Sequence, residues 1–187
     1  DLKTPLTRIN LMIEEMDNDD LQISISKNIS EMNLMLNHYL DFIKNEKNEN
    51  FNEIETQKFI KDLTFNYTKL NLTRNESKTI LIRKNQISRA IVNILDNANK
   101  FAEKIYMSSN ISETKWVITI EDDGPGTSLS QEELVKPFTK GSEQLNQGTG
   151  LGLSIVQKLI KLNNGELRFE DSSYGGLRVQ ISLELNY

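Results

Sequence analysis

Glycine is confined to the last third of this chain, and that uneven distribution limits what each part can fold into. All 9 glycines of the 187 residues lie at or after Gly124, so the first 123 residues contain none. Glycine is the residue that adopts positive φ without strain. We therefore expect the first part to consist of regular elements joined by ordinary turns, and the glycine-rich part to let the backbone approach a ligand closely.

Composition excludes several classes of function. The formal net charge of −5 argues against a protein that binds duplex nucleic acid, because such proteins carry a basic surface. The chain contains no cysteine, so a disulfide framework and a thiolate metal site are both excluded. No apolar run approaches the roughly 18 residues that a membrane-spanning helix needs. We expect no nucleic-acid partner, and membrane attachment only through upstream segments.

Two amphipathic segments open the chain. Apolar residues alternate spacings of three and four over residues 2–16 and again over 25–43, the pattern of helices packed at a shallow angle. The polar residues 17–20 between them predict an antiparallel helical hairpin at 1–46, followed by a polar linker at 47–54. The second helix has more apolar residues than one stripe requires. It therefore packs either on the downstream domain or, as we favour, in a four-helix bundle made by two chains.

Residues 55–187 alternate between helical and strand patterns. Helices alternating with mostly antiparallel strands indicate an α+β fold, in which this part is an α/β two-layer sandwich. The predicted helices are 56–67, 85–101 and 152–162, and the predicted strands are 68–73, 78–82, 104–109, 116–122, 166–171 and 176–185.

The predicted helix 85–101 carries a polar face. Asn93, Asn97 and Lys100 are spaced i, i+4 and i+7, so they share one side of an otherwise apolar helix. An amide oxygen is a suitable ligand for magnesium, and a nearby lysine balances phosphate charge. Polar residues at this spacing more often form a plain solvated face, so this patch alone does not decide the function.

Two glycine-rich segments supply further candidates. Glu121-Asp122-Asp123-Gly124-Pro125-Gly126 follows a predicted strand, where a carboxylate can accept a hydrogen bond from an adenine amino group. A plain β-turn explains the same residues. Gly148-Thr149-Gly150-Leu151-Gly152-Leu153 leads into a helix, and its backbone N–H groups can cradle phosphate. A flexible hinge is the alternative. The segment 148–153 is not the dinucleotide-binding fingerprint, since no strand immediately precedes it.

These patches, with a possible lid at 135–141, resemble in order and spacing the ATPase domain of sensor histidine kinases, a branch of the gyrase, Hsp90 and MutL superfamily. Residues 93–101 look like the N box, Asp122 to Gly126 the first glycine box, Phe138 the F box, and 148–153 the second glycine box. The resemblance implies that Asn97 binds magnesium, Asp122 reads adenine, and Asn93 orders water and metal. The other ATP-binding residues that it implies are Lys100, Phe101, Gly124, Gly126, Phe138, Lys140, Gly148, Thr149, Gly150, Leu151, Gly152 and Leu153.

The N-terminus sharpens the resemblance. Asp1-Leu2-Lys3-Thr4-Pro5-Leu6 is similar to the H box without its leading histidine, most like EnvZ-type osmosensor kinases. The resemblance implies a homodimer, ATP-dependent phosphorylation of a histidine just upstream of Asp1, and transfer to and dephosphorylation of a response-regulator aspartate. Asp1 would orient the imidazole and Thr4 a water. The single histidine, His38, does not match the acceptor position, so we expect it to be structural.

Alternatives remain open. A nucleotide-binding interaction module or phosphatase-biased pseudokinase would use ATP only to control conformation. An ATPase of the Hsp90, gyrase or MutL kind is disfavoured, because those enzymes have a glutamate base where this chain has Asn93. Val135 and Lys140 depart from the kinase pattern, which often has an aromatic residue and an arginine there. The resemblance further implies that this part is cytoplasmic and that the full-length protein lies in the plasma membrane.

Overall fold

The computed structural model describes residues 9, 21–23, 25–26, 29–30, 32, 49–139 and 150–185. The chain forms two compact units, Asp1–Asn48 and Glu49–Tyr187. The described residues of the first unit are helical. Most of the predicted hairpin, including Asp1 and Thr4, lies outside the described residues.

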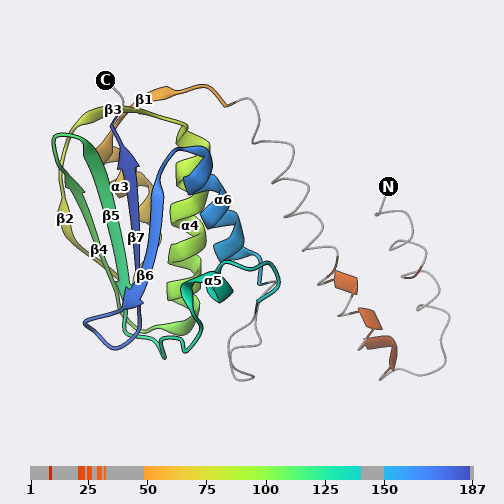
Figure 1. The fold of residues 1–187 in the computed structure, drawn as a ribbon. Helices are drawn as coiled ribbons and strands as arrows, with labels where there is room; N and C mark the ends of the chain where they lie inside the picture. The colour runs from red at the N-terminus through yellow and green to blue at the C-terminus, as the bar shows by residue number, and fades with distance from the viewer. Residues whose placement is uncertain are drawn as a thin grey trace. The chain divides into compact units, whose positions relative to one another are not determined.

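The second unit is a two-layer α/β sandwich (Figure 1). Its main sheet has the strand order β2-β4-β5-β7-β6, in which β2 and β4 run parallel and the other neighbours antiparallel. Helix α4 contacts β4 and β5, α6 contacts β6, and the two helices contact each other. The strands of the main sheet are β2 (Leu70–Asn75), β4 (Ile105–Ile111), β5 (Lys115–Asp122), β6 (Glu166–Asp171) and β7 (Leu177–Glu184). The other elements are β1 (Asn52–Glu55), α3 (Thr56–Thr64), β3 (Thr79–Ile82), α4 (Lys84–Phe101), α5 (Gln131–Leu134) and α6 (Gly152–Leu162).

The core lies between the main sheet and the helices. Buried and less buried residues alternate along β4 and β7, as the two-residue period of a strand requires, and Trp116 of β5 is fully buried. Helix α4 presents one apolar face, and a buried isoleucine or leucine stabilises the fold by about 1.5–3 kcal/mol. The prediction of that face is confirmed for Ile87, Ala90, Ile91, Ile94, Leu95 and Ala98.

Two short elements differ from the expectation. The first three residues of strand β1 belong to the predicted linker 47–54, and the strand pairs with β3 in a separate two-stranded sheet. Its sequence, NEIE, buries only Ile54, which is too little to give a strand period. Helix α5 lies between the predicted strand 116–122 and the predicted helix 152–162, where we expected no helix. It begins with a capping box between Ser130 and Glu133.

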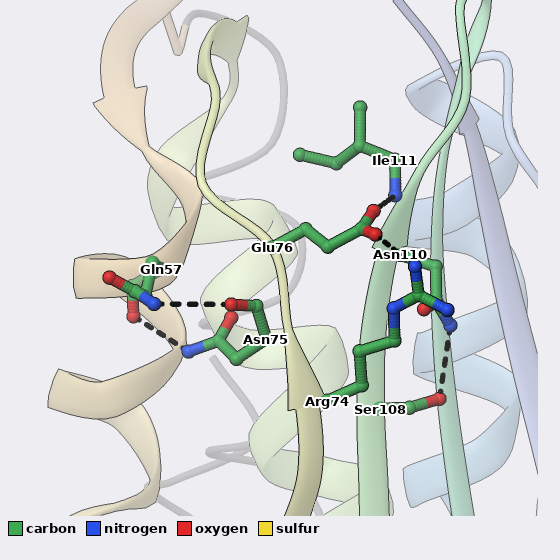
Figure 2. Close-up of polar contacts among 7 residues, drawn as sticks. All are labelled: Gln57, Arg74, Asn75, Glu76, Ser108, Asn110 and Ile111. Carbon is green, nitrogen blue, oxygen red and sulfur yellow. Dashed lines mark hydrogen bonds and ion pairs between the residues drawn. The ribbon is translucent and has the colours of Figure 1, made fainter.

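A polar cluster joins α3 to β2, the edge strand of the main sheet, and joins the end of β2 to β4 (Figure 2). Gln57 and Asn75 exchange side-chain to backbone hydrogen bonds of 3.2 and 3.0 Å. The Glu76 carboxylate accepts hydrogen bonds from the Ile111 backbone N–H and from Arg74. These two hydrogen bonds hold the pKa of Glu76 below its usual range, and the one from the Ile111 N–H has the larger effect. These bonds fix the end of a strand that has a neighbour on one side only.

Helix α4 is held at both ends by side chains from outside the helix. The Glu49 carboxylate accepts hydrogen bonds from the backbone N–H groups of Asn85 at 2.7 Å and Gln86 at 3.0 Å. At the other end, Lys69 Nζ donates to the carbonyls of Asn99 and Ala102. Both contacts satisfy groups that a helix leaves unpaired at its ends, with the charges that the helix dipole favours.

Candidate nucleotide-binding site

The start of α6 lies against the polar face of α4. Asn93 and Asn97 are half-buried on α4, and Asn93 Nδ2 donates to the carbonyl of Arg89 at 2.9 Å. A Cβ built on Gly152 would lie 3.5 Å from Asn97 Nδ2 and 3.8 Å from Asn93 Oδ1. The fold therefore brings the predicted N box and second glycine box together.

The N-terminus of α6 and the lid segment are joined by their backbones. Phe138 N–H donates to the carbonyl of Gly150 at 2.9 Å. Gly150 has φ +67°, and a Cβ there would lie 2.7 Å from the carbonyl carbon of Phe138, so only glycine fits. Phe138 itself is 62% exposed. The first turn of α6 thus offers backbone N–H groups beside two amide side chains, an arrangement that suits phosphate.

At the end of β5, the Asp122 carboxylate is fixed by backbone donors. Its Oδ1 accepts hydrogen bonds from Gly124 N–H at 2.9 Å and Leu177 N–H at 3.2 Å, and its carbonyl accepts from Gly176 N–H at 3.1 Å. Because these bonds use Oδ1, the second oxygen, Oδ2, is the one offered to a ligand. A recessed acceptor of this kind suits the amino group of adenine.

Asp122 and its neighbour Asp123 differ in their electrostatics. Burial raises the pKa of Asp122, and the nearby Asp123 adds to this, although the Gly124 and Leu177 N–H groups oppose it. The Lys104 backbone N–H, above all, lowers the pKa of Asp123, whose Oδ1 also accepts from Glu103 N–H. Asp123 therefore acts as a structural carboxylate, whereas the environment of Asp122 disfavours its charge.

Sequence reasoning missed the β6–β7 turn as part of this site. A Cβ on Gly176 would overlap Asp122 Oδ1 and lie 2.6 Å from the Gly124 nitrogen. Gly126, with φ +64°, lies against the same turn, since its Cβ would be 3.6 Å from the carbonyl oxygens of Gly175 and Gly176. The paired glycines were the available signal, but we assigned Gly176 only to a strand.

Replacing Gly176 with alanine is expected to destabilise the fold by about 1–3 kcal/mol, the usual effect of overpacking, and to displace Asp122. Urea unfolding measures this effect. Gly152→Ala is the matched control, because its nearest contact would be an ordinary 3.5 Å. Equal stability of the Gly176 variant and the unsubstituted protein would contradict the crowding seen here.

Some of the remaining predicted residues are described by the structure, and three are not. Lys100 is exposed, with Nζ 5.1 Å from the centroid of the half-buried Phe101 ring. A Cβ on Gly124 would lie 3.2 Å from the Phe101 carbonyl oxygen, so the end of α4 meets the first glycine loop. Leu151 is buried and Leu153 half-buried at the start of α6. The predictions that lie outside the described residues are Lys140, Gly148 and Thr149.

The donor set fits a cation that arrives with phosphate. Among residues 49–139 and 150–185, and the few described before them, no three His, Cys, Asp or Glu side chains could together hold a metal ion. The amides of Asn93 and Asn97 can supply oxygen ligands, and Mg²⁺ commonly completes such a set with phosphate oxygens and water.

Among the residues that the structure describes, no helix is long and apolar enough to cross a membrane.

Comparison with known proteins agrees with this geometry. The family model described as "Histidine kinase-, DNA gyrase B-, and HSP90-like ATPase" matches residues 82–187. The chain is 27% identical to the sensor histidine kinase GtrS of Pseudomonas aeruginosa over 98% of its own length and 40% of that protein. It spans less than half the length of the first curated relatives that it matches.

Solved structures show the same fold. The Acinetobacter baumannii histidine kinase AdeS aligns with a TM-score of 0.69 at 21% identity, over 100% of this chain and 98% of that chain. The histidine kinase domain of the E. coli osmosensor EnvZ aligns with a TM-score of 0.58 at 26% identity, over 75% of this chain and 92% of that chain. The chain therefore belongs to the histidine kinase-, DNA gyrase B- and HSP90-like ATPase family, and its second unit is an ATPase core of the sensor histidine kinase type.

Proposed function

We propose that this chain is the kinase core of a two-component sensor histidine kinase, which binds ATP with Mg²⁺ and transfers the γ-phosphoryl group to a histidine. The observation that carries the proposal is the approach of Gly152 to the amides of Asn93 and Asn97. It puts phosphate-binding backbone and cation-binding side chains at one place in the fold.

In this proposal Asp122 binds the adenine end of the nucleotide. Its Oδ2 accepts a hydrogen bond from the adenine amino group, while Gly124 and Gly126 let the backbone come close to the base. Phe101 adds apolar surface beside them. The support is the fixed and recessed geometry of the Asp122 carboxylate.

The phosphate end is bound by residues of α4, the lid and α6. Asn97 would hold Mg²⁺, Asn93 would order the surrounding water, and Lys100 would balance phosphate charge. Catalysis then rests on positioning and on neutralising that charge. The backbone and lid contacts would come from Phe138, Lys140, Gly148, Thr149, Gly150, Leu151, Gly152 and Leu153.

The role of the first unit rests on the sequence and on the comparisons. The similarity to GtrS covers 98% of this chain and so includes the residues before Glu49. We propose that residues 1–46 form the dimerisation and phosphotransfer hairpin, with Asp1 orienting the acceptor imidazole. The partner is then the receiver domain of a response regulator, and Thr4 positions a water for its dephosphorylation. We place this part in the cytoplasm, with the full-length protein in the plasma membrane.

A labelling experiment tests the proposal. A chain with a histidine placed before Asp1 is incubated with γ-labelled ATP and Mg²⁺. The P–O bond of ATP breaks, a P–N bond to the imidazole forms, and ADP and a proton are released. Acid-labile, alkali-stable label on the protein is expected, and none in the same chain carrying Asn97→Ala. Tight ATP binding without label would instead favour a module in which ATP controls conformation only.

A further inference from the structure

The turn between α3 and β2 holds the C-terminal half of α4. The Tyr67 hydroxyl donates a hydrogen bond of 2.6 Å to Asp96 Oδ1. Lys69 Nζ donates to the carbonyls of Asn99 at 3.0 Å and Ala102 at 2.8 Å. These contacts span the last two turns of the helix.

The held residues alternate with those that the site uses. Asp96 directly precedes Asn97, and Lys100 and Phe101 lie between the two carbonyls that Lys69 binds. The last carbonyls of a helix have no partner within it, so an end without a cap frays. Fraying here would move the proposed cation ligand and phosphate-facing lysine, rather than a remote part of the helix.

The turn is a fixed anchor. Its backbone is closed by hydrogen bonds from Tyr67 N–H to the Thr64 carbonyl and from Leu70 N–H to the Tyr67 carbonyl. The Lys69 carbonyl accepts a hydrogen bond from Ile105 N–H at the start of β4, at 3.0 Å. With the polar cluster at the far ends of α3 and β2, the turn is tied to the sheet, so it can hold α4 in place.

Chemistry makes both anchors suitable for this role. The Lys69 ammonium meets the negative end of the helix dipole, where a cation is favoured. Burial raises the pKa of Tyr67, and the hydrogen bond to Asp96 raises it further by a smaller amount. Its hydroxyl therefore remains a donor through the neutral range.

We propose that Tyr67 and Lys69 are positioning residues for nucleotide binding, which keep Asn97 and Lys100 in place for the phosphates and their cation. Neither residue is among those to which the proposed function gives a nucleotide contact. The inference rests on the proposed function, since it needs a magnesium-dependent nucleotide site on α4. It predicts that loss of the anchors weakens the magnesium-dependent part of binding.

The test compares binding of a non-hydrolysable ATP analogue with Mg²⁺ and with EDTA, well below the unfolding temperature. Tyr67→Phe/Lys69→Met is expected to raise Kd with Mg²⁺ on the order of tenfold, which corresponds to 1.4 kcal/mol. In EDTA the change should stay below about twofold. A variant that is merely less stable would lower both affinities by the same factor, because only the folded fraction binds.

Arg83→Met is the matched control. Arg83 Nη1 donates to the carbonyl of Leu162, so it is also a cation at a helix C-terminus, but α6 meets the site with its other end. This control should lower stability without changing the ratio of the two affinities. Lys69→Arg keeps the cation and should keep the ratio, and Lys69→Met alone serves if the double variant does not fold.

The outcomes separate the two proposals. An unchanged ratio in the double variant or in Lys69→Met, with normal binding by the unsubstituted protein, would make the turn a structural cap and overturn the inference. If the unsubstituted protein itself showed no magnesium-dependent binding, the proposed function would fail first and the inference with it.

Discussion

Replacing Asn97 with alanine is expected to weaken binding of the magnesium–nucleotide complex by roughly 10- to 100-fold. The substitution removes the amide oxygen proposed to ligate the cation, and a bond to a charged partner contributes about 1.5–3 kcal/mol. Affinity falls tenfold for each 1.4 kcal/mol, which gives that range. Isothermal titration calorimetry with and without Mg²⁺ measures the effect. Most of the loss should disappear in EDTA, where no cation is present to bind.

Asn99→Ala provides the control for this experiment. Asn99 is exposed on the same helix two residues later, and its contact with Lys69 uses the backbone carbonyl, which alanine retains. The control should bind the nucleotide as the unsubstituted protein does. If both alanine variants behaved alike, Asn97 would have no special role and our assignment of the cation ligand would be wrong.

Replacing Asp122 with asparagine is expected to weaken nucleotide binding by a similar factor. Asparagine can keep its Oδ1 as the acceptor for Gly124 and Leu177 N–H, and its amide then presents N–H donors in place of Oδ2. The adenine amino group is also a donor, so two donors face each other. An unsatisfied buried donor costs about 1–3 kcal/mol, or roughly 5- to 150-fold in affinity.

The same substitution should not destabilise the nucleotide-free protein at neutral pH. The folded-state pKa of Asp122 is raised, mainly by burial, so its contribution to stability is fully present below its ordinary value of 3.8. That contribution is lost as the pH rises through the folded-state pKa. Asp122→Asn is therefore expected to melt at an equal or higher temperature at pH 7, with the advantage disappearing in acid.

Asp123→Asn is the matched comparison, since the same change is made at the next residue. The pKa of Asp123 is lowered, chiefly by the Lys104 N–H, so its contribution is present above its ordinary value of 3.8 and lost as the pH falls. This variant should melt at a lower temperature at pH 7. Thermal melts of both variants across pH 3 to 8 test the opposite signs, and an Asp122→Asn protein that melts early at pH 7 would contradict this account.

Local pattern was enough to predict the elements that carry the site. The buried face of α4 follows from apolar residues at helical spacing, and the bounds of α6 follow from its opening glycine and its apolar run. The fold class is confirmed for the second unit because periods of 3.6 and 2 alternate along it. Strand β1 has no such period, since only Ile54 of its four residues is buried.

The sequence by itself determined which residues are chemically suited to a nucleotide: the amides on one helix face, the carboxylate at a strand end, and the glycines that reach positive φ. Tertiary structure alone decided which of them meet. Gly152 lies against Asn93 and Asn97, and the β6–β7 turn holds Asp122, because segments distant in sequence pack together. The same holds for Glu49 and Lys69 at the ends of α4. Periodicity and backbone preference act over a few residues. A helix cap or a contact supplied by a segment distant in sequence depends on long-range packing, which no local pattern records.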